Sequence, residues 1–239
     1  MSMSSRMRAQ RKLAVVLLVV AGVAAADSSR LLPDGFAVER YLASPPPPGS
    51  VAANHDLQAL LALQRGRTAA DVADARADQE VSVFRFADVM GPSFTAARLP
   101  RTAALAQRAC RESSRYTAAA KRYWNRPRPF VASAEVEPVL RKSADGSYPS
   151  GHATCGYLWA ILLSEMLPEQ RAAIFERGLR YGRNRAVGGV HYPSDVEAGR
   201  IAAAAIATAM FSSESFRRDF EAARAETRAT LIDAAALAH

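Results

Sequence analysis

The pattern of hydrophobic and polar positions predicts helices along most of the chain. From residue 51 onward apolar residues recur at helical spacing among Ala, Leu, Arg, Glu and Gln, which favour helix. The first apolar positions of this pattern are Leu57, Leu60, Leu61, Leu63, Val72, Ala75, Val81, Phe84 and Phe86. Later helices are predicted over residues 103–123, 153–167, 168–185, 196–211 and 214–237. Because alternating strand patterns are nearly absent, we predict an all-α fold, a helical bundle.

Two apolar runs lie within these predicted helices, at residues 153–163 and 201–210. Both are shorter than the ~20 residues that cross a bilayer, and Glu165 follows the first run closely. We expect both runs to be buried at the centre of the bundle, where small alanine side chains let helices approach closely.

The N-terminal segment has the layout of a secretory signal peptide. Four basic residues precede an uncharged apolar run over residues 13–23, and three alanines ending at Ala26 follow. We expect cleavage after Ala26 and export to the periplasm or the medium. No Arg-Arg pair precedes the apolar run, which favours the general secretion route. No membrane segment is then expected in the mature chain. An uncleaved anchor is the alternative.

The remaining chain is long enough for one main domain. Its 239 residues, 49% hydrophobic and 23% charged, have an ordinary globular composition. The run Pro45 to Pro48 cannot continue a helix and predicts an extended spacer. We therefore expect a signal peptide at 1–26, a Pro-rich lead-in at 27–50 and a helical domain at 51–239, with its catalytic core at about residues 100–212.

Charge and cysteine content narrow the function and the compartment. The formal net charge of +8 falls to +4 without the signal peptide, because 27 basic residues then face 23 acidic ones. Basic and acidic residues are interspersed, and no motif for reading nucleic acid is present, so we expect no nucleic-acid partner.

Export would bring Cys110 and Cys155 to an oxidising compartment. A disulfide and two buried thiols stay open as alternatives.

The first segment that carries chemistry is residues 121–129, KRYWNRPRP. It places Lys121 at the end of a predicted helix and Arg128 in a loop broken by prolines. Arginine offers a planar fork of donors that matches phosphate oxygens, and lysine offers a compact charge. The segment is consistent with a cationic pocket, or with a basic helix end that complements the helix dipole.

The second segment is residues 146–152, GSYPSGH, which lead into the apolar helix near Ala153. Ser150 and Gly151 would lie at a helix N-terminus, where unpaired N–H groups and the helix dipole favour an anion. The glycine also permits close approach. His152 would present a nitrogen suited to proton donation at the same place. A serine N-cap beside a surface histidine is the alternative.

The third segment is residues 185–195, RAVGGVHYPSD. Gly188 and Gly189 predict a turn, and Pro193 starts the next helix. His191 and Asp195 are four residues apart, so the carboxylate of Asp195 can reach back to an imidazole N–H, fix its tautomer and leave the other nitrogen as a nucleophile. The alternative is a local His-Asp cap pair.

Together, in this order, the segments K-x6-R-P, P-S-G-H and R-x5-H-x3-D resemble the signature of the type 2 phosphatidic acid phosphatase and vanadium haloperoxidase superfamily. Residues 146–153 and 194–199 resemble the bacterial class A non-specific acid phosphatases most closely. The strong resemblance covers about residues 118–202, and residues 41–50 look like the start of that class. Asn184 stands where the family has Ser, and Ala153 where it has Thr. These departures put substrate positioning in doubt, not the reaction.

The resemblance implies metal-independent hydrolysis of phosphate monoesters without a cofactor. His191 would attack phosphorus and form a phosphohistidine, Asp195 would orient His191, and His152 would protonate the departing alcohol and then activate water. The groups implied to hold the phosphate oxygens are Lys121, Arg128, Arg185 and the backbone N–H groups near Ser150 and Gly151. Small phosphorylated substrates, inhibition by vanadate and a dimer or larger assembly are also implied.

Two other functions fit parts of the same pattern. A vanadium-dependent haloperoxidase would hold vanadate with the same residues, although the compact size and the second motif favour the phosphatase. A non-catalytic anion-binding protein of the envelope would need the cations but not both histidines. No group of residues has the spacing of a metal site. We interpret the His55-Asp56 pair as a cap or a solvated pair, and His55 and His239 as surface or structural residues.

Overall fold

The computed structural model describes residues 31–232, and all regular structure within that range is helical. The longer helices are α1 (Val51–Gly66), α4 (Pro100–Trp124), α6 (Gly151–Met166), α7 (Arg171–Val187), α8 (Pro193–Ser212) and α9 (Glu214–Leu231). The shorter ones are α2 (Ala69–Ala77), α3 (Ala87–Met90) and α5 (Pro129–Ala132), with 3-10 turns η1 (Val38–Tyr41), η2 (Val83–Phe86) and η3 (Pro168–Gln170). The all-α prediction is confirmed.

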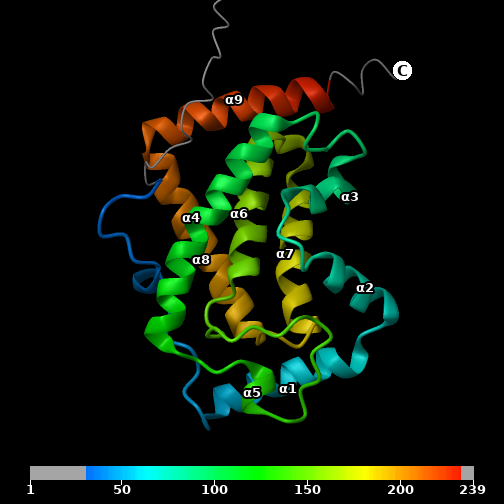
Figure 1. Ribbon diagram of the computed structural model, residues 1–239, viewed down its shortest axis with the longest axis vertical. Coiled ribbons are helices and arrows are strands. Elements are labelled where there is room, and N and C mark those ends of the chain that lie inside the picture. The colour runs from blue at the N-terminus through cyan, green and yellow to red at the C-terminus, as the bar shows by residue number, and fades with distance from the viewer. Residues whose placement is uncertain (1–30, 233–239) are drawn as a thin grey trace, which may run out of the picture.

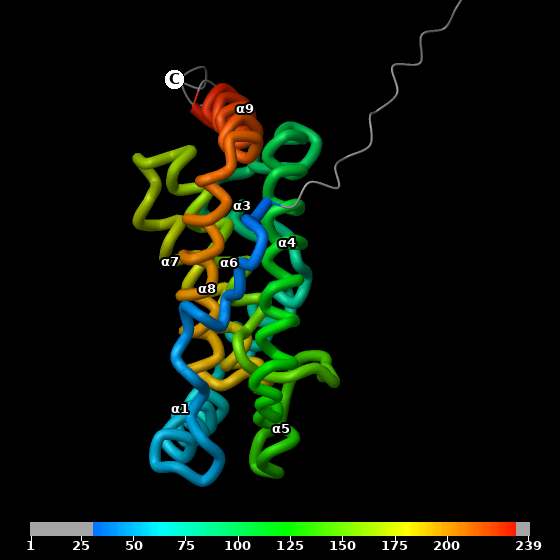
Figure 2. The backbone as a smooth tube through the Cα atoms, turned by 90° about the vertical axis from the view of Figure 1, so that its left-hand side faces the viewer, coloured from blue at the N-terminus to red at the C-terminus, as the bar shows by residue number. Residues whose placement is uncertain are grey.

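Helix α6 lies at the centre of the bundle, flanked by α4, α7 and α8 (Figure 1). Most of its side chains are buried, as expected for the apolar run at 153–163. Helix α9 crosses one end of the bundle, and α1 and α5 lie at the opposite end (Figures 1 and 2). The run at 201–210 in α8 is buried on one face only, because Ile201 and Thr208 are exposed. Complete burial of that second run was therefore a wrong expectation.

Close helix packing around α6 depends on glycine as well as alanine. A Cβ atom on Gly156 of α6 would lie 2.5 Å from the ring of Tyr181 on α7. A Cβ atom on Gly199 of α8 would lie 2.7 Å from the carbonyl oxygen of Ser150 at the start of α6. Real Cβ atoms do not approach other atoms this closely, so these glycines let α7 and α8 contact α6. Through Gly199, the first turn of α6 is held directly against α8.

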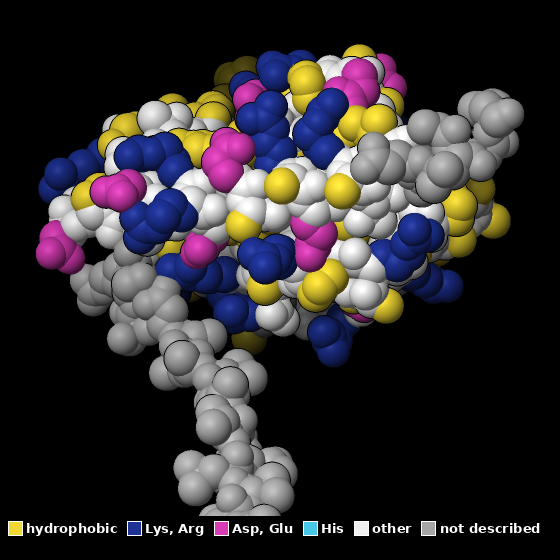
Figure 3. Space-filling model, turned by 90° about the horizontal axis from the view of Figure 1, so that it is seen from above, with side chains coloured by type: hydrophobic (Ala, Val, Ile, Leu, Met, Phe, Trp, Pro, Cys, Tyr) yellow, Lys and Arg dark blue, Asp and Glu magenta, His cyan; other side chains and the backbone are white. Residues whose placement is uncertain are grey.

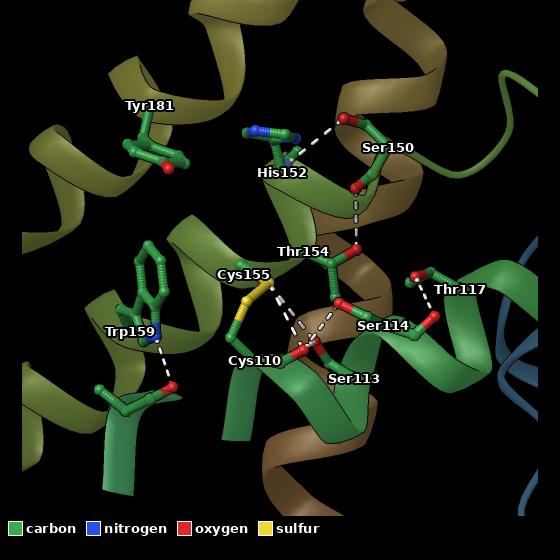
Figure 4. Close-up of a disulfide and its surroundings, with 12 residues drawn as sticks. Cys110, Ser113, Ser114, Thr117, Ser150, His152, Thr154, Cys155, Trp159 and Tyr181 are labelled. Carbon is green, nitrogen blue, oxygen red and sulfur yellow. Dashed lines mark hydrogen bonds between the residues drawn. A yellow bond between two sulfur atoms is a disulfide. The ribbon is translucent and has the colours of Figure 1, made fainter. Parts of the chain in front are cut away.

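A disulfide between Cys110 of α4 and Cys155 of α6 joins the central helix to its neighbour (Figure 4). The two Cα atoms are 5.0 Å apart, within the ordinary range for a disulfide. One turn further along α6, the indole N–H of Trp159 donates to the carbonyl oxygen of Ala106 at 2.9 Å. The structure thus resolves the alternatives that the sequence left open for the cysteines.

The segment before α1 belongs to the folded core. Leu31, Leu32 and Val38 are buried against the main hydrophobic cluster, so the folded body begins before residue 51, where the sequence placed its start. The predicted signal peptide lies outside the described residues. Two predicted helices also differ in detail. Val81 lies outside any helix, and Phe84 and Phe86 lie in the 3-10 turn η2. The predicted extension of α9 to residue 237 lies outside the described residues.

The surface over the α9 end of the molecule carries mixed charge. Lys and Arg side chains lie among Asp and Glu side chains there, without a large patch of one sign (Figure 3). Arg218, for example, pairs with Glu214 at 2.7 Å. Between residues 31 and 232, no helix combines the length and apolar character that a bilayer crossing requires.

Candidate active site

Four helix ends meet at the end of the bundle that faces away from α9. Helices α4 and α7 finish there, and α6 and α8 begin there (Figure 1). The three predicted chemical segments all lie at these ends. The predicted site residues that are buried here are Lys121, Arg128, Ser150, Arg185, His191 and Asp195, while Gly151 and His152 are half-buried. The fold therefore brings all three segments to one place.

Lys121 and Arg128 hold the same carboxylate. The Nζ atom of Lys121, in the last turn of α4, lies 2.5 Å from one oxygen of Asp145, and Nη2 of Arg128 lies 2.5 Å from the other. Arg128 is the N-cap residue of α5, and its Nε atom also donates to the carbonyl oxygen of Asp145 at 3.1 Å. Burial and the nearby Arg128 lower the pKa of Lys121. Two buried cations thus face one partly exposed acidic side chain.

His191 is almost wholly buried between an acceptor and a donor. Its Nδ1 atom lies 3.3 Å from Oδ2 of Asp195, and its Nε2 atom lies 2.8 Å from Nη1 of Arg128. We assign the proton to Nδ1, because Asp195 can only accept and Arg128 can only donate. Burial first, and then the charge of Arg128, hold the pKa of His191 well below its usual value. The imidazole is therefore neutral, with a lone pair on Nε2.

Asp195, in the first turn of α8, is surrounded by donors. Its Oδ2 atom accepts from the hydroxyl of Ser147 at 2.5 Å and from the backbone N–H of Tyr192 at 2.8 Å. Its Oδ1 atom accepts from Arg126 at 2.6 Å. Burial raises the pKa of Asp195, and these donors oppose that effect. Since all the contacts are donated to it, we treat Asp195 as an ionised carboxylate whose position is fixed.

Arg126 and Asp56 extend this network and were missed in the sequence. Arg126 is buried, bridges Asp195 and Asp56, and lies over the ring of Tyr192 at 4.0 Å from its centroid. Asp56 accepts from the backbone N–H of Ser194 at 3.0 Å, so it caps α8 from α1. A solvated role for Asp56 was therefore a wrong interpretation, whereas His55 is exposed as expected. In the sequence, the indication of a role for Arg126 was its place in the basic segment 121–129, two residues before Arg128.

His152, in the first turn of α6, lies beside Tyr181 with the two rings roughly parallel, 6.3 Å apart (Figure 4). Its Nε2 atom contacts the carbonyl oxygen of Gln79 at 3.2 Å. Burial, with Arg185 nearby, lowers the pKa of His152 to about 4. An anion bound beside it would raise that pKa again, because the anion favours the charged imidazolium.

Ser150 lies at the start of α6, as the sequence suggested, but its backbone N–H is not free to bind an anion. Its hydroxyl accepts from the backbone N–H of Ala153 at 3.4 Å, which makes it the N-cap of α6. Its own backbone N–H donates to the carbonyl oxygen of Asp195 at 2.9 Å and is therefore already used. The first-turn N–H groups of Gly151 and His152 have no acceptor within the helix and point outward from its end. An anion bound at this helix end would therefore contact the backbone N–H groups of Gly151 and His152.

Arg185, in the last turn of α7, is the third cation. It is buried, and within residues 31–232 its Nε and Nη1 atoms have no hydrogen-bond partner. Burial lowers the pKa of Arg185 to about 10, which still leaves it charged at neutral pH. Two buried guanidinium nitrogens without partners are costly, and an oxyanion would satisfy them.

The two departures from the family pattern have structural explanations. The amide of Asn184 donates to Asp74 at 2.9 Å and to Asp78 at 2.8 Å, so it joins α7 to α2. Ala153 is buried, and a Cβ atom on Gly199 would lie 2.9 Å from the alanine Cβ. The alanine methyl fits this close contact between α6 and α8. The hydrogen bonds of His191 are made with Arg128 and Asp195, not with either of these residues.

The fold and site define a class of protein: an α-helical bundle that brings three cationic side chains, two histidines and a buried aspartate together at its helix ends. Within the described part of the chain, no group of three or more His, Cys, Asp or Glu residues is placed to hold a metal ion. The chain belongs to the PAP2 superfamily. The sequence pattern of that superfamily matches residues 103–219.

Several bacterial proteins are similar in sequence to this chain over most of its length. The chain is 38% identical over 196 residues to an acid phosphatase of Zymomonas mobilis, covering 78% of this chain and 74% of that protein. It is 33% identical over 197 residues to a non-specific acid phosphatase of Salmonella typhi, covering 76% and 77%. It is 31% identical over 208 residues to a non-specific acid phosphatase of Providencia stuartii, covering 82% and 83%.

The fold is also similar to that of a bacterial vanadium-dependent iodoperoxidase. The TM-score is 0.56 at 18% identity, and the likeness covers 73% of this chain and 53% of the peroxidase chain. At that identity the likeness concerns the fold alone. The expected bundle of the phosphatase and haloperoxidase kind is confirmed.

Proposed function

We propose that this protein is an acid phosphatase that hydrolyses small phosphate monoesters through a phosphohistidine on His191. The observation that carries the proposal is the state of His191, which is neutral, buried and bonded through Nδ1 to Asp195, with Nε2 directed at the cationic cluster. The acid phosphatase names of three relatives support the same activity. These relatives favour a phosphatase over the haloperoxidase that the fold also resembles.

In the first step, Nε2 of His191 attacks phosphorus while the bond from phosphorus to the ester oxygen breaks. Lys121, Arg128 and Arg185 would neutralise the three oxygens that do not react, which lowers the energy of the transition state more than that of the substrate. Asp195 stabilises the positive charge that develops on the imidazole. Protonated His152 gives its proton to the departing alkoxide, which leaves as an alcohol.

In the second step, the now neutral His152 takes a proton from water as the water oxygen attacks phosphorus. The bond from phosphorus to Nε2 breaks, phosphate is released, and His191 regains its lone pair. His152 is protonated again, so the cycle closes without a change in the enzyme. No step requires a metal ion, since the cationic side chains carry the electrostatic stabilisation.

A hydrolysis assay with p-nitrophenyl phosphate at mildly acid pH tests this function. Activity should survive EDTA and be blocked by vanadate, whose five-coordinate form resembles the transition state. Loss of activity on chelation would instead identify a metallophosphatase. Oxidation of halide by peroxide with vanadate, in the absence of phosphatase activity, would identify a haloperoxidase. Binding of phosphate without either reaction would leave a non-catalytic anion-binding protein.

Replacing His152 with alanine should slow hydrolysis by about 10²-fold for a good leaving group and by about 10³-fold for an alkyl phosphate, because only a poor leaving group depends strongly on protonation. With a pKa of about 4 in the free enzyme, His152 loses its proton as the pH rises. The wild-type kcat/KM should therefore fall toward neutral pH, and the variant should lack that dependence. The comparison is made on kcat/KM, which reports the step in which the alcohol leaves, and equal losses of kcat/KM for both substrates would exclude His152 as the acid.

The cellular setting is part of the proposal. The signal-peptide pattern of residues 1–26 supports export to the periplasm or the medium, where the disulfide between Cys110 and Cys155 persists. A homodimer or larger assembly is proposed from the family resemblance. Size-exclusion chromatography with light scattering on the secreted chain tests the assembly, and its intact mass by mass spectrometry tests the cleavage after Ala26.

A further inference from the structure

Asp145 occupies the place where the substrate phosphate would meet two of its cations. It lies on the connection from α5 to α6, and its carboxylate contacts Lys121 and Arg128 at 2.5 Å each. The hydroxyl of Ser143 donates to the same carboxylate. The side chains of Lys121 and Arg128 are 9% and 6% exposed, whereas that of Asp145 is 49% exposed. An exposed acidic group therefore covers two buried basic ones.

The contacts of Arg128 show what this arrangement does to the nucleophile. Its guanidinium has five N–H donors. Four of them are engaged, by the carbonyl and carboxylate of Asp145, the carbonyl of Val190 and Nε2 of His191. The lone pair of Nε2 is thus bonded to Arg128 at 2.8 Å, in the direction needed to attack phosphorus. In this arrangement Arg128 engages the lone pair that His191 would use to attack phosphorus.

The loop that carries Asp145 is anchored by backbone hydrogen bonds near its two ends, and its tip contacts Lys121 and Arg128. The backbone N–H of Arg141 donates to the side chain of Gln79 at 2.8 Å, and that of Ser147 donates to the carbonyl oxygen of Arg126 at 2.8 Å. Between these anchors, residues 142–145 are exposed. The Asp145 side chain can therefore leave the cations for solvent without disturbing the anchors.

We propose that Asp145 is an internal latch, a carboxylate that occupies the phosphate site and is displaced by the phosphate group of the substrate. An incoming phosphate takes over the donors of Lys121 and Arg128, and Asp145 moves into solvent. Arg128 then turns its N–H groups to phosphate oxygens and releases Nε2 of His191. The nucleophile is unblocked only when a phosphate is bound, so the latch selects ligands that replace a carboxylate on two cations at once. This inference rests on the proposed phosphate site.

The test is the binding of inorganic phosphate to the mature secreted protein by isothermal titration calorimetry. Asp145→Asn should bind phosphate about tenfold more tightly than the wild type, because the competing carboxylate is gone, and the KM for p-nitrophenyl phosphate should fall in parallel. Ser143→Ala removes one donor to the latch and should shift both values in the same direction, by a smaller factor. Glu137→Gln is the control, since it removes an exposed carboxylate from the same connection and should change neither value.

Each result decides a different question. Phosphate binding by Asp145→Asn that is equal to or weaker than that of the wild type, together with normal wild-type activity, would overturn the latch and make Asp145 a positioning residue for the cations. If Asp145→Asn does not fold, an unchanged phosphate affinity in Ser143→Ala would overturn the latch. If Glu137→Gln bound phosphate as tightly as Asp145→Asn, the gain in affinity would come from the loss of any negative charge on this connection, and the latch would be overturned as well. If the wild type neither bound phosphate nor hydrolysed phosphate esters, the proposed phosphate site would be wrong, and the latch would be wrong for the same reason.

Discussion

Replacing His191 with alanine should reduce turnover of p-nitrophenyl phosphate by at least about 10⁴-fold, because removal of a nucleophile that acts together with its partners stops the covalent route. Lys121, Arg128 and Arg185 stay in place in this variant. Inorganic phosphate should therefore still bind, and calorimetry beside the activity assay separates chemistry from binding. The loss should appear in kcat rather than in the affinity for phosphate.

His55→Ala is the matched control for this variant, since His55 is the exposed histidine next to Asp56 on α1. It should keep full activity. Near-native turnover of His191→Ala would show that another group attacks phosphorus, and the proposed role of His191 would then be wrong.

Replacing Arg126 with methionine should have the largest effect on stability, a loss of about 3–5 kcal/mol, because it leaves buried carboxylates without their cation. Arg126 pairs with Asp195 at 2.6 Å and with Asp56 at 2.7 Å, and both partners are buried. Without its contact to Arg126, the carboxylate of Asp195 would not be fixed in position, and it would no longer hold Nδ1 of His191 in place. We therefore expect kcat to fall by about 10²-fold with little change in KM. Chemical denaturation measures the stability, and steady-state kinetics measures the activity.

Two further variants separate charge from side-chain volume at this position. Arg126→Lys keeps one positive charge and should recover part of both losses. Arg122→Met removes an exposed arginine from the same stretch of chain and should change neither quantity. If Arg126→Met kept wild-type stability and kcat, Asp195 would not depend on Arg126, and the network behind His191 would have no positioning role.

The sequence predicted those parts of the fold and site that depend on local spacing. Helical periodicity gave the main helices of the bundle, and the four-residue separation between His191 and Asp195 predicted their contact at the start of a helix. Both follow from the geometry of a single turn, which the sequence determines directly. The cationic positions Lys121 and Arg128 were identified through the resemblance of the three segments, taken in order, to a known superfamily, because a basic helix end alone is common.

The parts that the sequence did not predict depend on contacts between distant segments. Asp56 contacts Ser194, 138 positions away in the sequence, and Arg126, 70 positions away, and nothing in its neighbourhood on α1 indicates that it is buried. Asp145 was not singled out, because its contact with Lys121 depends on how the loop from α5 to α6 folds back on α4. The N–H of Ser150 looked free from the sequence alone, since its acceptor is a carbonyl of α8.

The most direct test of catalysis through His191 is to trap the covalent intermediate. The enzyme is mixed briefly with a labelled phosphate monoester and quenched in base, where phosphohistidine survives, and the labelled peptide is identified by mass spectrometry. We predict a label on His191 that forms and decays within one turnover, and its absence in His191→Ala. A label on another residue, or hydrolysis by an active enzyme with no covalent label at any time, would contradict the mechanism.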